Sequence, residues 1–192
     1  MITEEQTLII DNEVIRAEID RYTEEDKESI IEIYDAWRTL SVNLNNLGCR
    51  KPNFPEISEI IFCFVYDCWR TNNLSSGTHT SFDCYNPKTN KTIQIKATSI
   101  SNDLTSFGPK SVWEELYFLD FYNEDENGNA NYNGDFKVYL IPNDEVYNHK
   151  MNKNQTFVDQ QKEGRRPRFG IKKELITPLG LKPIGEFNIY NL

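Results

Sequence analysis

The N-terminal part of the chain combines a strand-like hydrophobic pattern with a helical one. TLIIDNEVIRAEI, Thr7 to Ile19, has two apolar runs on either side of Asp11-Asn12, which predicts a β-hairpin. Thr23 and the acids after it are typical of a helix start, and apolar residues then recur at helical spacing up to Gly48. The members of this stripe are Ile30, Ile33, Tyr34, Trp37, Leu40, Leu44 and Leu47. We expect a helix that packs against the core.

A second helix is predicted from start signals at Asn53, Pro55 and Glu56. Its apolar stripe consists of Ile57, Ile60, Ile61, Phe64, Val65 and Cys68. Glu59 lies just beside this stripe, and the Asn, Ser and Gly cluster from Asn72 to Gly77 ends the helix.

Strand-like patterns dominate the rest of the chain. They are SFDCYNPKTNKTIQIKATSI (Ser81 to Ile100, two strands), LYFLDFY (Leu116 to Tyr122) and DFKVYLIP (Asp135 to Pro142). We also expect a short helix around Pro109 to Glu115, an exposed loop from Asn123 to Gly134, and short β pieces near the C-terminus. The chain length of 192 residues and this order of elements predict one α/β domain, residues 1–192. We expect a mixed sheet flanked by the two N-terminal helices.

The predicted hairpin within Ser81 to Ile100 places polar side chains on one face. A four-residue loop, Pro87 to Asn90, is a length usually built around a type I turn. The pairs that follow are Asn86 with Lys91, Asp83 with Gln94, and Ser81 with Lys96. Strand side chains alternate, so these pairs share a face, while Ile93, Ile95 and Ala97 turn to the core.

A carboxylate, an amide oxygen and an ammonium group within a few ångströms form a candidate cation site. Asp and amide oxygens, with a backbone carbonyl, are the hard ligands that suit Mg²⁺. A metal bound there would lower the pKa of a coordinated water molecule and neutralise charge that develops on a phosphate. A solvent-exposed strand face would carry the same residue types, so register alone does not distinguish the two interpretations.

Composition excludes several other functions. The four cysteines, Cys49, Cys63, Cys68 and Cys84, lack C-x-x-C spacing, and His79 and His149 lie far apart, which argues against a zinc site. We expect buried free thiols without chemistry. The chain has no apolar stretch long enough to span a membrane and no basic secretory n-region, so we expect a cytoplasmic protein.

Charge is segregated along the chain. The net charge of −9 argues on its own against nucleic-acid binding. Residues 1–35 contain 12 acids and 3 bases, whereas residues 149–173 contain 8 Lys or Arg and 2 acids. The second segment therefore offers the local positive potential that DNA requires.

The arrangement D-x(10)-Q-x-K, from Asp83 to Lys96, resembles the PD-(D/E)XK nuclease signature. Gln94 stands in the place of the usual acid, and Phe82 replaces the motif's proline. The resemblance implies a nuclease core in which Asp83, Gln94 and the Ile95 carbonyl bind Mg²⁺. It assigns Lys96 to orienting the attacking water and offsetting charge on the scissile phosphate. Glu59, with Glu56 second, is our candidate for an assisting helix acid, although either could be ordinary surface charge.

Three longer strings resemble a small family of type II restriction endonucleases that recognise GCNGC. They are TSFDCYNPKTNKTIQIKA, DLTSFGPKSVWEELYF and IPNDEVYNHKMNKNQTFVDQQKEGRRPRF, within about residues 80–169. The resemblance implies Mg²⁺-dependent cleavage of both DNA strands, a homodimer matching a palindromic site, and a partner methyltransferase acting on the same site. It predicts a catalytic hairpin at about 79–99 and a DNA-recognition segment at about 147–173.

Within the recognition segment, arginine is the side chain that pairs bidentately with guanine edges. Arg165, Arg166 and Arg168 are the predicted readers. Base or phosphate contacts are assigned to Asn148, Asn152, Gln160 and Gln161. Contacts with phosphates, which set the register on DNA, are assigned to Lys150, Lys153 and Lys162. A solvated basic loop that offsets the acidic N-terminus is the alternative.

Three other functions compete with a restriction endonuclease. The same nuclease core could serve repair or nicking. An acidic DNA-mimic or inhibitor protein would fit the pI of 4.8, but residues 149–173, the basic segment, argue against it. A catalytically inactive DNA-binding module would need a broken Asp83, Gln94 and Lys96 set, and the set is intact.

Overall fold

The predicted N-terminal hairpin forms, and its turn follows from its two central residues. In the computed structural model, which describes residues 1–74 and 82–192, β1 (Ile2–Ile10) pairs with β2 (Glu13–Arg21) and Ile10 lies opposite Glu13. Asp11 and Asn12 adopt φ values of 52° and 63°. A two-residue hairpin turn of this kind needs left-handed residues at both positions, which Asp and Asn tolerate.

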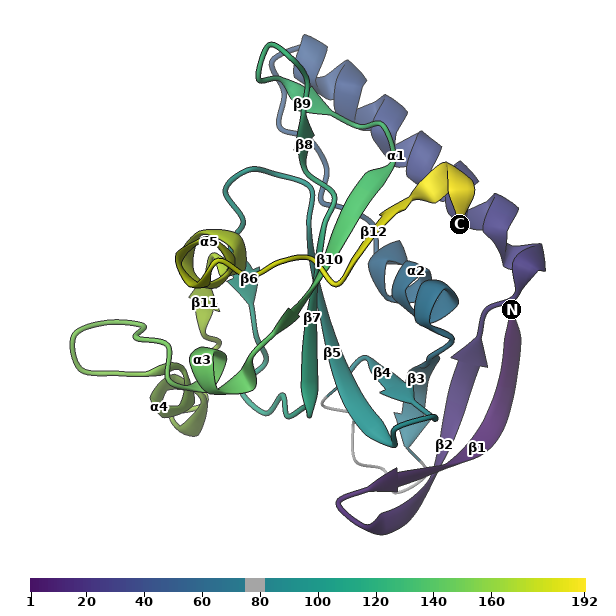
Figure 1. The fold of residues 1–192 in the computed structure, drawn as a ribbon, viewed down its shortest axis with the longest axis vertical. Helices are drawn as coiled ribbons and strands as arrows, with labels where there is room; N and C mark the ends of the chain where they lie inside the picture. The colour runs from purple at the N-terminus through teal and green to yellow at the C-terminus, as the bar shows by residue number, and fades with distance from the viewer. Residues whose placement is uncertain (75–81) are drawn as a thin grey trace.

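The hairpin opens one large sheet of eight strands, ordered β1-β2-β3-β4-β5-β7-β10-β12 (Figure 1). Among the described strands of this sheet, only β5 and β7 pair in parallel. The remaining strands of the sheet are β3 (Trp69–Leu74), β4 (Cys84–Asn86), β5 (Lys91–Thr98), β7 (Glu115–Asp120), β10 (Asp135–Ile141) and β12 (Gly185–Asn188). The expectation of a sheet flanked by helices is confirmed, with a sheet that is mostly antiparallel.

One face of the sheet is covered by α1 (Lys27–Asn46), which follows a 3-10 turn (Glu24–Asp26), and by α2 (Ile57–Tyr66) (Figure 1). Ile30, Tyr34 and Trp37 of α1 enter this core with the odd-numbered residues Ile93 and Ile95 of β5. The predicted stripe of α1 is too wide, because Ile33, Leu40 and Leu47 are exposed. The buried residues of α1 lie along one narrow side of the helix, which also includes Ser41.

The opposite face is covered by C-terminal elements (Figure 1). They are α3 (Asn143–Tyr147), α4 (Phe157–Lys162), a π-helical turn (Lys172–Ile176) and α5 (Thr177–Leu179), together with β11 (Arg168–Phe169) paired to β6 (Thr105–Ser106). Phe107, Trp113, Phe157 and Phe169 form an aromatic cluster in this second core. The sheet is therefore a buried middle layer.

Some local predictions were wrong. No helix forms at 109–114, and β7 begins at Glu115. The second helix was predicted to continue up to the cluster that starts at Asn72. It ends at Tyr66, where Asp67 takes a left-handed conformation, and β3 follows at Trp69. The exposed loop carries a small hairpin, β8 (Asn123–Glu124) and β9 (Ala130–Asn131), and the chain ends in a 3-10 turn (Ile189–Asn191). No helix within the described residues is long and apolar enough to cross a membrane.

Candidate active site

The predicted hairpin register is observed. Cys84 pairs with Ile93 and Asn86 pairs with Lys91 across the turn that ends at Asn90. One position further out, the Asp83 backbone N–H donates to the Ile93 carbonyl at 2.9 Å. The Gln94 amide Nε2 donates to Asp83 Oδ2, so these two side chains meet as predicted. Ser81, expected opposite Lys96, and residues 79–80 of the predicted catalytic hairpin lie outside the described residues.

The two strands separate at Asp83. The Ile95 N–H donates to Asp83 Oδ2 at 2.8 Å, so a side-chain oxygen takes the place of a β4 carbonyl. The N–H and C=O of one residue in an antiparallel pair point toward the same neighbouring strand. The Ile95 carbonyl therefore faces the same gap as the Asp83 carboxylate.

Gln94 and Lys96 point toward the second core, because their parallel neighbours on β7 are Leu116 and Phe118 of that core. Gln94 is 3% exposed, whereas Lys96 is half-buried, with its Nζ 5.6 Å from the centre of the Phe107 ring. A buried amide needs hydrogen-bond partners, and Asp83 supplies one. This arrangement differs from the solvent-exposed strand face that was the alternative.

The electrostatic surroundings of Asp83 have opposing effects on its carboxyl group. Burial, the largest cause, raises the pKa of Asp83 to about 6. The Lys96 ammonium lowers it and the Glu59 carboxylate raises it, while the Ile95 N–H and Arg70 lower it. Lys96, Glu59 and Arg70 thus each lie within electrostatic reach of Asp83.

Glu59 does not contact Asp83 directly. Its Oε2 accepts from Arg70 Nε at 2.8 Å, and Arg70 Nη1 lies 4.0 Å from Asp20 Oδ2. Glu56, the second candidate, is exposed at the start of α2. The sequence predictions missed Arg70 and Asp20, because β3 was taken as the end of a helix and the pairing of β2 with β3 carries no local signal.

A cation could be held here only by a mixed donor set. Within residues 1–74 and 82–192, no three His, Cys, Asp or Glu side chains cluster as a metal site. The hairpin instead offers one carboxylate, one amide and one backbone carbonyl. All three supply hard oxygen donors, which fit Mg²⁺ with several retained waters. The Gln94 amide must turn, because its nitrogen now faces Asp83.

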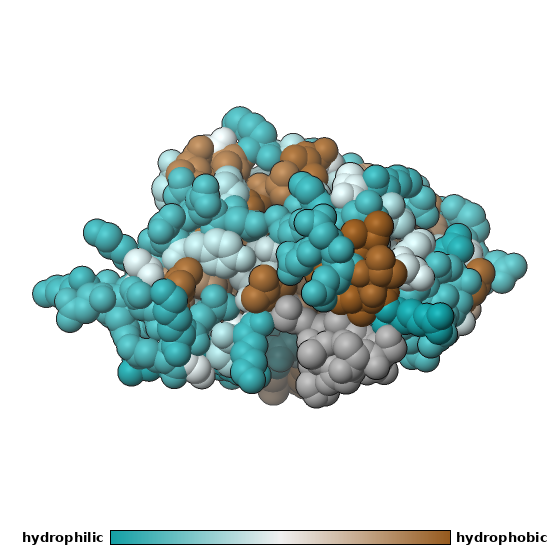
Figure 2. All heavy atoms as spheres, turned by 90° about the horizontal axis from the view of Figure 1, so that it is seen from below, coloured by the Kyte–Doolittle hydropathy of each residue, from teal (hydrophilic) through white to brown (hydrophobic). Residues whose placement is uncertain are grey.

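The basic segment lies on the same side of the sheet as Lys96. Phe107 stacks on Phe169 with ring centres 5.6 Å apart, and its N–H donates to the Pro167 carbonyl at 3.0 Å. Because Phe107 also contacts Lys96, one aromatic residue connects the hairpin to the strand that carries Arg168. The end of the molecule that includes α4 is mostly hydrophilic (Figure 2).

The predicted DNA-contacting residues differ in their solvent exposure and in whether their side chains already have partners. Arg165, Arg166 and Arg168 are exposed, as are Asn148, Lys150, Asn152, Lys153 and Lys162. Arg165 pairs with Glu163 at 3.1 Å, while the side chains of Arg166 and Arg168 have no ion-pair partner in the described part of the chain. Gln160 is half-buried. Gln161 donates to the carbonyls of Gly108 and Ser111, both at 3.1 Å, so its amide nitrogen anchors α4.

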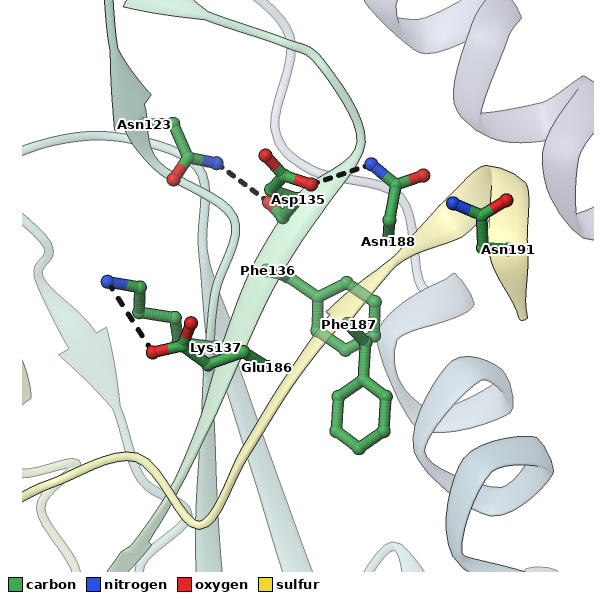
Figure 3. A pocket seen from close by; sticks show the side chains of 8 residues that line it. All are labelled: Asn123, Asp135, Phe136, Lys137, Glu186, Phe187, Asn188 and Asn191. Atoms are coloured by element: carbon green, nitrogen blue, oxygen red, sulfur yellow. Dashed lines mark hydrogen bonds and ion pairs between the residues drawn. The ribbon is translucent and has the colours of Figure 1, made fainter.

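A surface depression lies elsewhere, on β10 and β12 (Figure 3). It has a volume of about 630 Å³. Its polar side chains are engaged with one another, since Asp135 accepts from Asn188 at 2.6 Å and Lys137 lies 3.9 Å from Glu186 (Figure 3). None of its lining residues belongs to the hairpin or the basic segment.

Comparison with known proteins gives the family. The family model described as Bsp6I restriction endonuclease matches residues 22–178. The type II restriction enzyme Bsp6I of Bacillus sp. (strain RFL6) is 34% identical over 168 residues, which cover 84% of this chain and 87% of the relative. No solved structure matches the chain. The chain therefore belongs to the Bsp6I restriction endonuclease family and is a site-specific nuclease of the type II restriction class.

Proposed function

We propose that this enzyme cleaves both strands of double-stranded DNA at GCNGC in a Mg²⁺-dependent reaction. The observation that carries the chemistry is the Asp83 and Gln94 pair, with Gln94 almost fully buried, beside Lys96 and on the same side of the sheet as the exposed arginines. Burying such a pair costs desolvation free energy, whereas an ordinary solvent-exposed strand face keeps its polar groups hydrated. The GCNGC assignment is supported by the resemblance of the three long strings.

We infer a PD-(D/E)XK core from the same elements. A helix, α2, precedes an antiparallel hairpin, β4 and β5, and β5 then pairs in parallel with β7. The signature residues Asp83, Gln94 and Lys96 lie at the point where β4 and β5 separate.

Asp83, Gln94 through its amide oxygen, and the Ile95 carbonyl are the groups that would hold the cation. When bound, Mg²⁺ would act as a Lewis acid toward a water molecule and stabilise charge developing on the phosphate. The Lys96 ammonium orients the attacking water and offsets charge on the scissile phosphate. Hydrolysis leaves a 5′-phosphate and a 3′-hydroxyl, and Glu59 assists from α2.

Arg165, Arg166 and Arg168 are assigned to reading guanine edges, and Lys150, Lys153 and Lys162 to phosphates. Asn148, Asn152 and Gln160 add polar contacts. Gln161 contributes through its amide oxygen, because its nitrogen holds α4 in place. A palindromic site is matched by a two-fold symmetric homodimer, and a methyltransferase acting on the same sequence would protect host DNA.

The test is incubation of the purified enzyme with two plasmids of known sequence, one of which lacks GCNGC, in Mg²⁺ or EDTA. Sequencing of the fragment ends should show cuts at GCNGC with Mg²⁺ alone, and the second plasmid should stay intact. Discrete cuts at another sequence would refute the proposed site and keep the chemistry. Cleavage in EDTA would refute the Mg²⁺ dependence.

A further inference from the structure

Arg70 lies at the centre of an acidic surrounding beside the candidate active site. On β3 it is paired with Asp20 of β2 on one side and with Cys84 of β4 on the other. Cys84 directly follows Asp83. The long-range pairing of three strands therefore brings a guanidinium to the edge of the site.

The contacts of Arg70 are those of an ion-pair network. Its Nε is 2.8 Å from Glu59 Oε2, and its Nη1 is 4.0 Å from Asp20 Oδ2. The Arg70 side chain is 29% exposed, Glu59 25% and Asp20 7%, so these charges are largely shielded from water. Asp20 also accepts from Thr3 Oγ1 at 2.7 Å. Partly buried pairs of this kind interact more strongly than surface pairs.

The network reaches Asp83 through the backbone of β3. Arg70 is paired with Cys84, which directly follows Asp83, and the Thr71 N–H donates to the Asp83 carbonyl at 3.1 Å. The charges of Arg70 and Glu59 therefore lie close to any cation held at Asp83, although neither side chain bonds to the Asp83 side chain in the described structure.

We propose that Arg70 is a positioning residue of the active site: its guanidinium holds the Glu59 carboxylate and offsets its charge, so that Asp83 and Gln94 bind a single divalent cation with modest affinity. This inference rests on the proposed function, because it takes Asp83 as the cation ligand. Arg70 supplies the positive charge that a second cation near Glu59 would otherwise supply.

The sign of the electrostatic effect separates this role from a merely structural one. Removing a positive charge near a cation site leaves Glu59 unpaired and strengthens cation binding, while cleavage falls because Glu59 is no longer held. A residue that only supports the fold would weaken cation binding when it is replaced. Neutralising Glu59 should have the opposite effect, since Arg70 would then repel the cation.

The experiment measures Mn²⁺ binding to the full chain without DNA, from the electron paramagnetic resonance signal of the free ion. Mn²⁺ favours the same oxygen ligands as Mg²⁺. The wild type should bind one ion per chain. Arg70→Met should lower the Mn²⁺ dissociation constant about fivefold, Glu59→Gln should raise it about fivefold, and the double variant should return it close to the wild-type value.

Arg38→Met is the matched control, because Arg38 forms a similar pair with Asp35 at 3.2 Å on the exposed side of α1. It should leave Mn²⁺ binding unchanged. Unchanged or weaker binding by folded Arg70→Met would overturn the proposal. If that variant fails to fold, Glu59→Gln decides, and unchanged or tighter binding overturns it. Two ions per wild-type chain would also overturn it.

Asp83→Ala distinguishes a failure of the proposed metal site from a failure of the proposed role of Arg70. If it binds Mn²⁺ like the wild type, the proposed metal site itself is wrong. If it loses Mn²⁺ and Arg70→Met fails to gain affinity, only the role of Arg70 is wrong.

Discussion

At the scale of single residues, the proposed role of Asp83 conflicts with its contribution to stability. Its Oδ2 accepts both from the Ile95 N–H and from the Gln94 amide, yet burial raises its pKa to about 6. The ordinary value is 3.8. The folded protein therefore keeps a proton on Asp83 that the unfolded chain releases, and this carboxylate destabilises the fold as pH rises through 6.

We predict that Asp83→Asn stabilises the metal-free protein at pH 8. The amide keeps one oxygen for both hydrogen bonds and removes the charge, so the free energy of unfolding in EDTA should rise by about 1–2 kcal/mol. The gain should shrink toward zero at pH 4, where the wild-type carboxyl is protonated in the folded state. Urea denaturation at the two pH values measures it.

Asp125→Asn is the control for this prediction. The N–H of Asn129, with that of Asn127, lowers the pKa of the exposed Asp125, so its charged form favours the fold. This variant should lose stability at pH 8. A loss of stability in Asp83→Asn as well would show that the Asp83 charge does not oppose folding.

The residue scale also shows what sequence could and could not predict about the site. Asp83 and Gln94 could be paired from sequence because a short turn fixes their register. Arg70 could not be placed, since its contact with Glu59 depends on the pairing of β2, β3 and β4 over long separations.

At the scale of elements too, predictions that rest on local sequence signals were confirmed, and predictions that depend on tertiary packing or long-range pairing were wrong. The two hairpins, α1, β7 and β10 have strong local periodicity or clear turn residues, and they form. In WRTNNL, alternation is weak, so β3 was read as a helix end. The helical stretch at 172–179 was missed because Gly170 and Pro178 suggested short β pieces, whereas tertiary packing of Leu175 and Ile176 stabilises a helix.

One buried residue, Asp103, holds the C-terminal end of the basic segment by accepting backbone hydrogen bonds. Its carboxylate accepts from the backbone N–H groups of Ile171 at 2.7 Å and Lys172 at 3.2 Å, just after β11. It is 5% exposed. Asp103 therefore ties the end of the arginine-bearing strand to the loop before β6.

We predict that Asp103→Ala destabilises the fold by about 2–3 kcal/mol, because two buried N–H groups lose a charged acceptor. It should also weaken specific DNA binding, since Arg168 is no longer held. Denaturation and a DNA-binding titration in Ca²⁺ measure the two effects. Asp135→Ala, at the exposed first residue of β10, is the control and should leave DNA affinity unchanged. Equal losses of DNA affinity in both variants would contradict the role given to Asp103.

At the scale of the whole molecule, the segregated charge explains how a chain with a net charge of −9 can bind DNA. The acids concentrate in the N-terminal third, and exposed bases concentrate in residues 149–173, on the same side of the sheet as Lys96. Phosphate contacts and base contacts should then respond differently to salt and to sequence.

We predict that Lys150→Ala weakens binding to specific and nonspecific DNA alike and reduces the slope of log affinity against log salt by about 1. Arg166→Ala should cost about 1–3 kcal/mol for GCNGC alone. Fluorescence anisotropy over a salt series in Ca²⁺ distinguishes them. If Arg166→Ala weakened binding to every sequence equally, Arg166 would be a phosphate contact and not a reader.

The most direct measurement of the central claim compares Lys96→Ala with Lys88→Ala. Lys96 lies beside Asp83 and Gln94, whereas Lys88, in the turn of the same hairpin, forms an exposed pair with Asp67 at 2.9 Å. Single-turnover cleavage of GCNGC DNA in Mg²⁺ should be about 10²- to 10³-fold slower for Lys96→Ala, with specific binding retained, and unchanged for Lys88→Ala. Cleavage by Lys96→Ala at close to the wild-type rate would place the active site elsewhere.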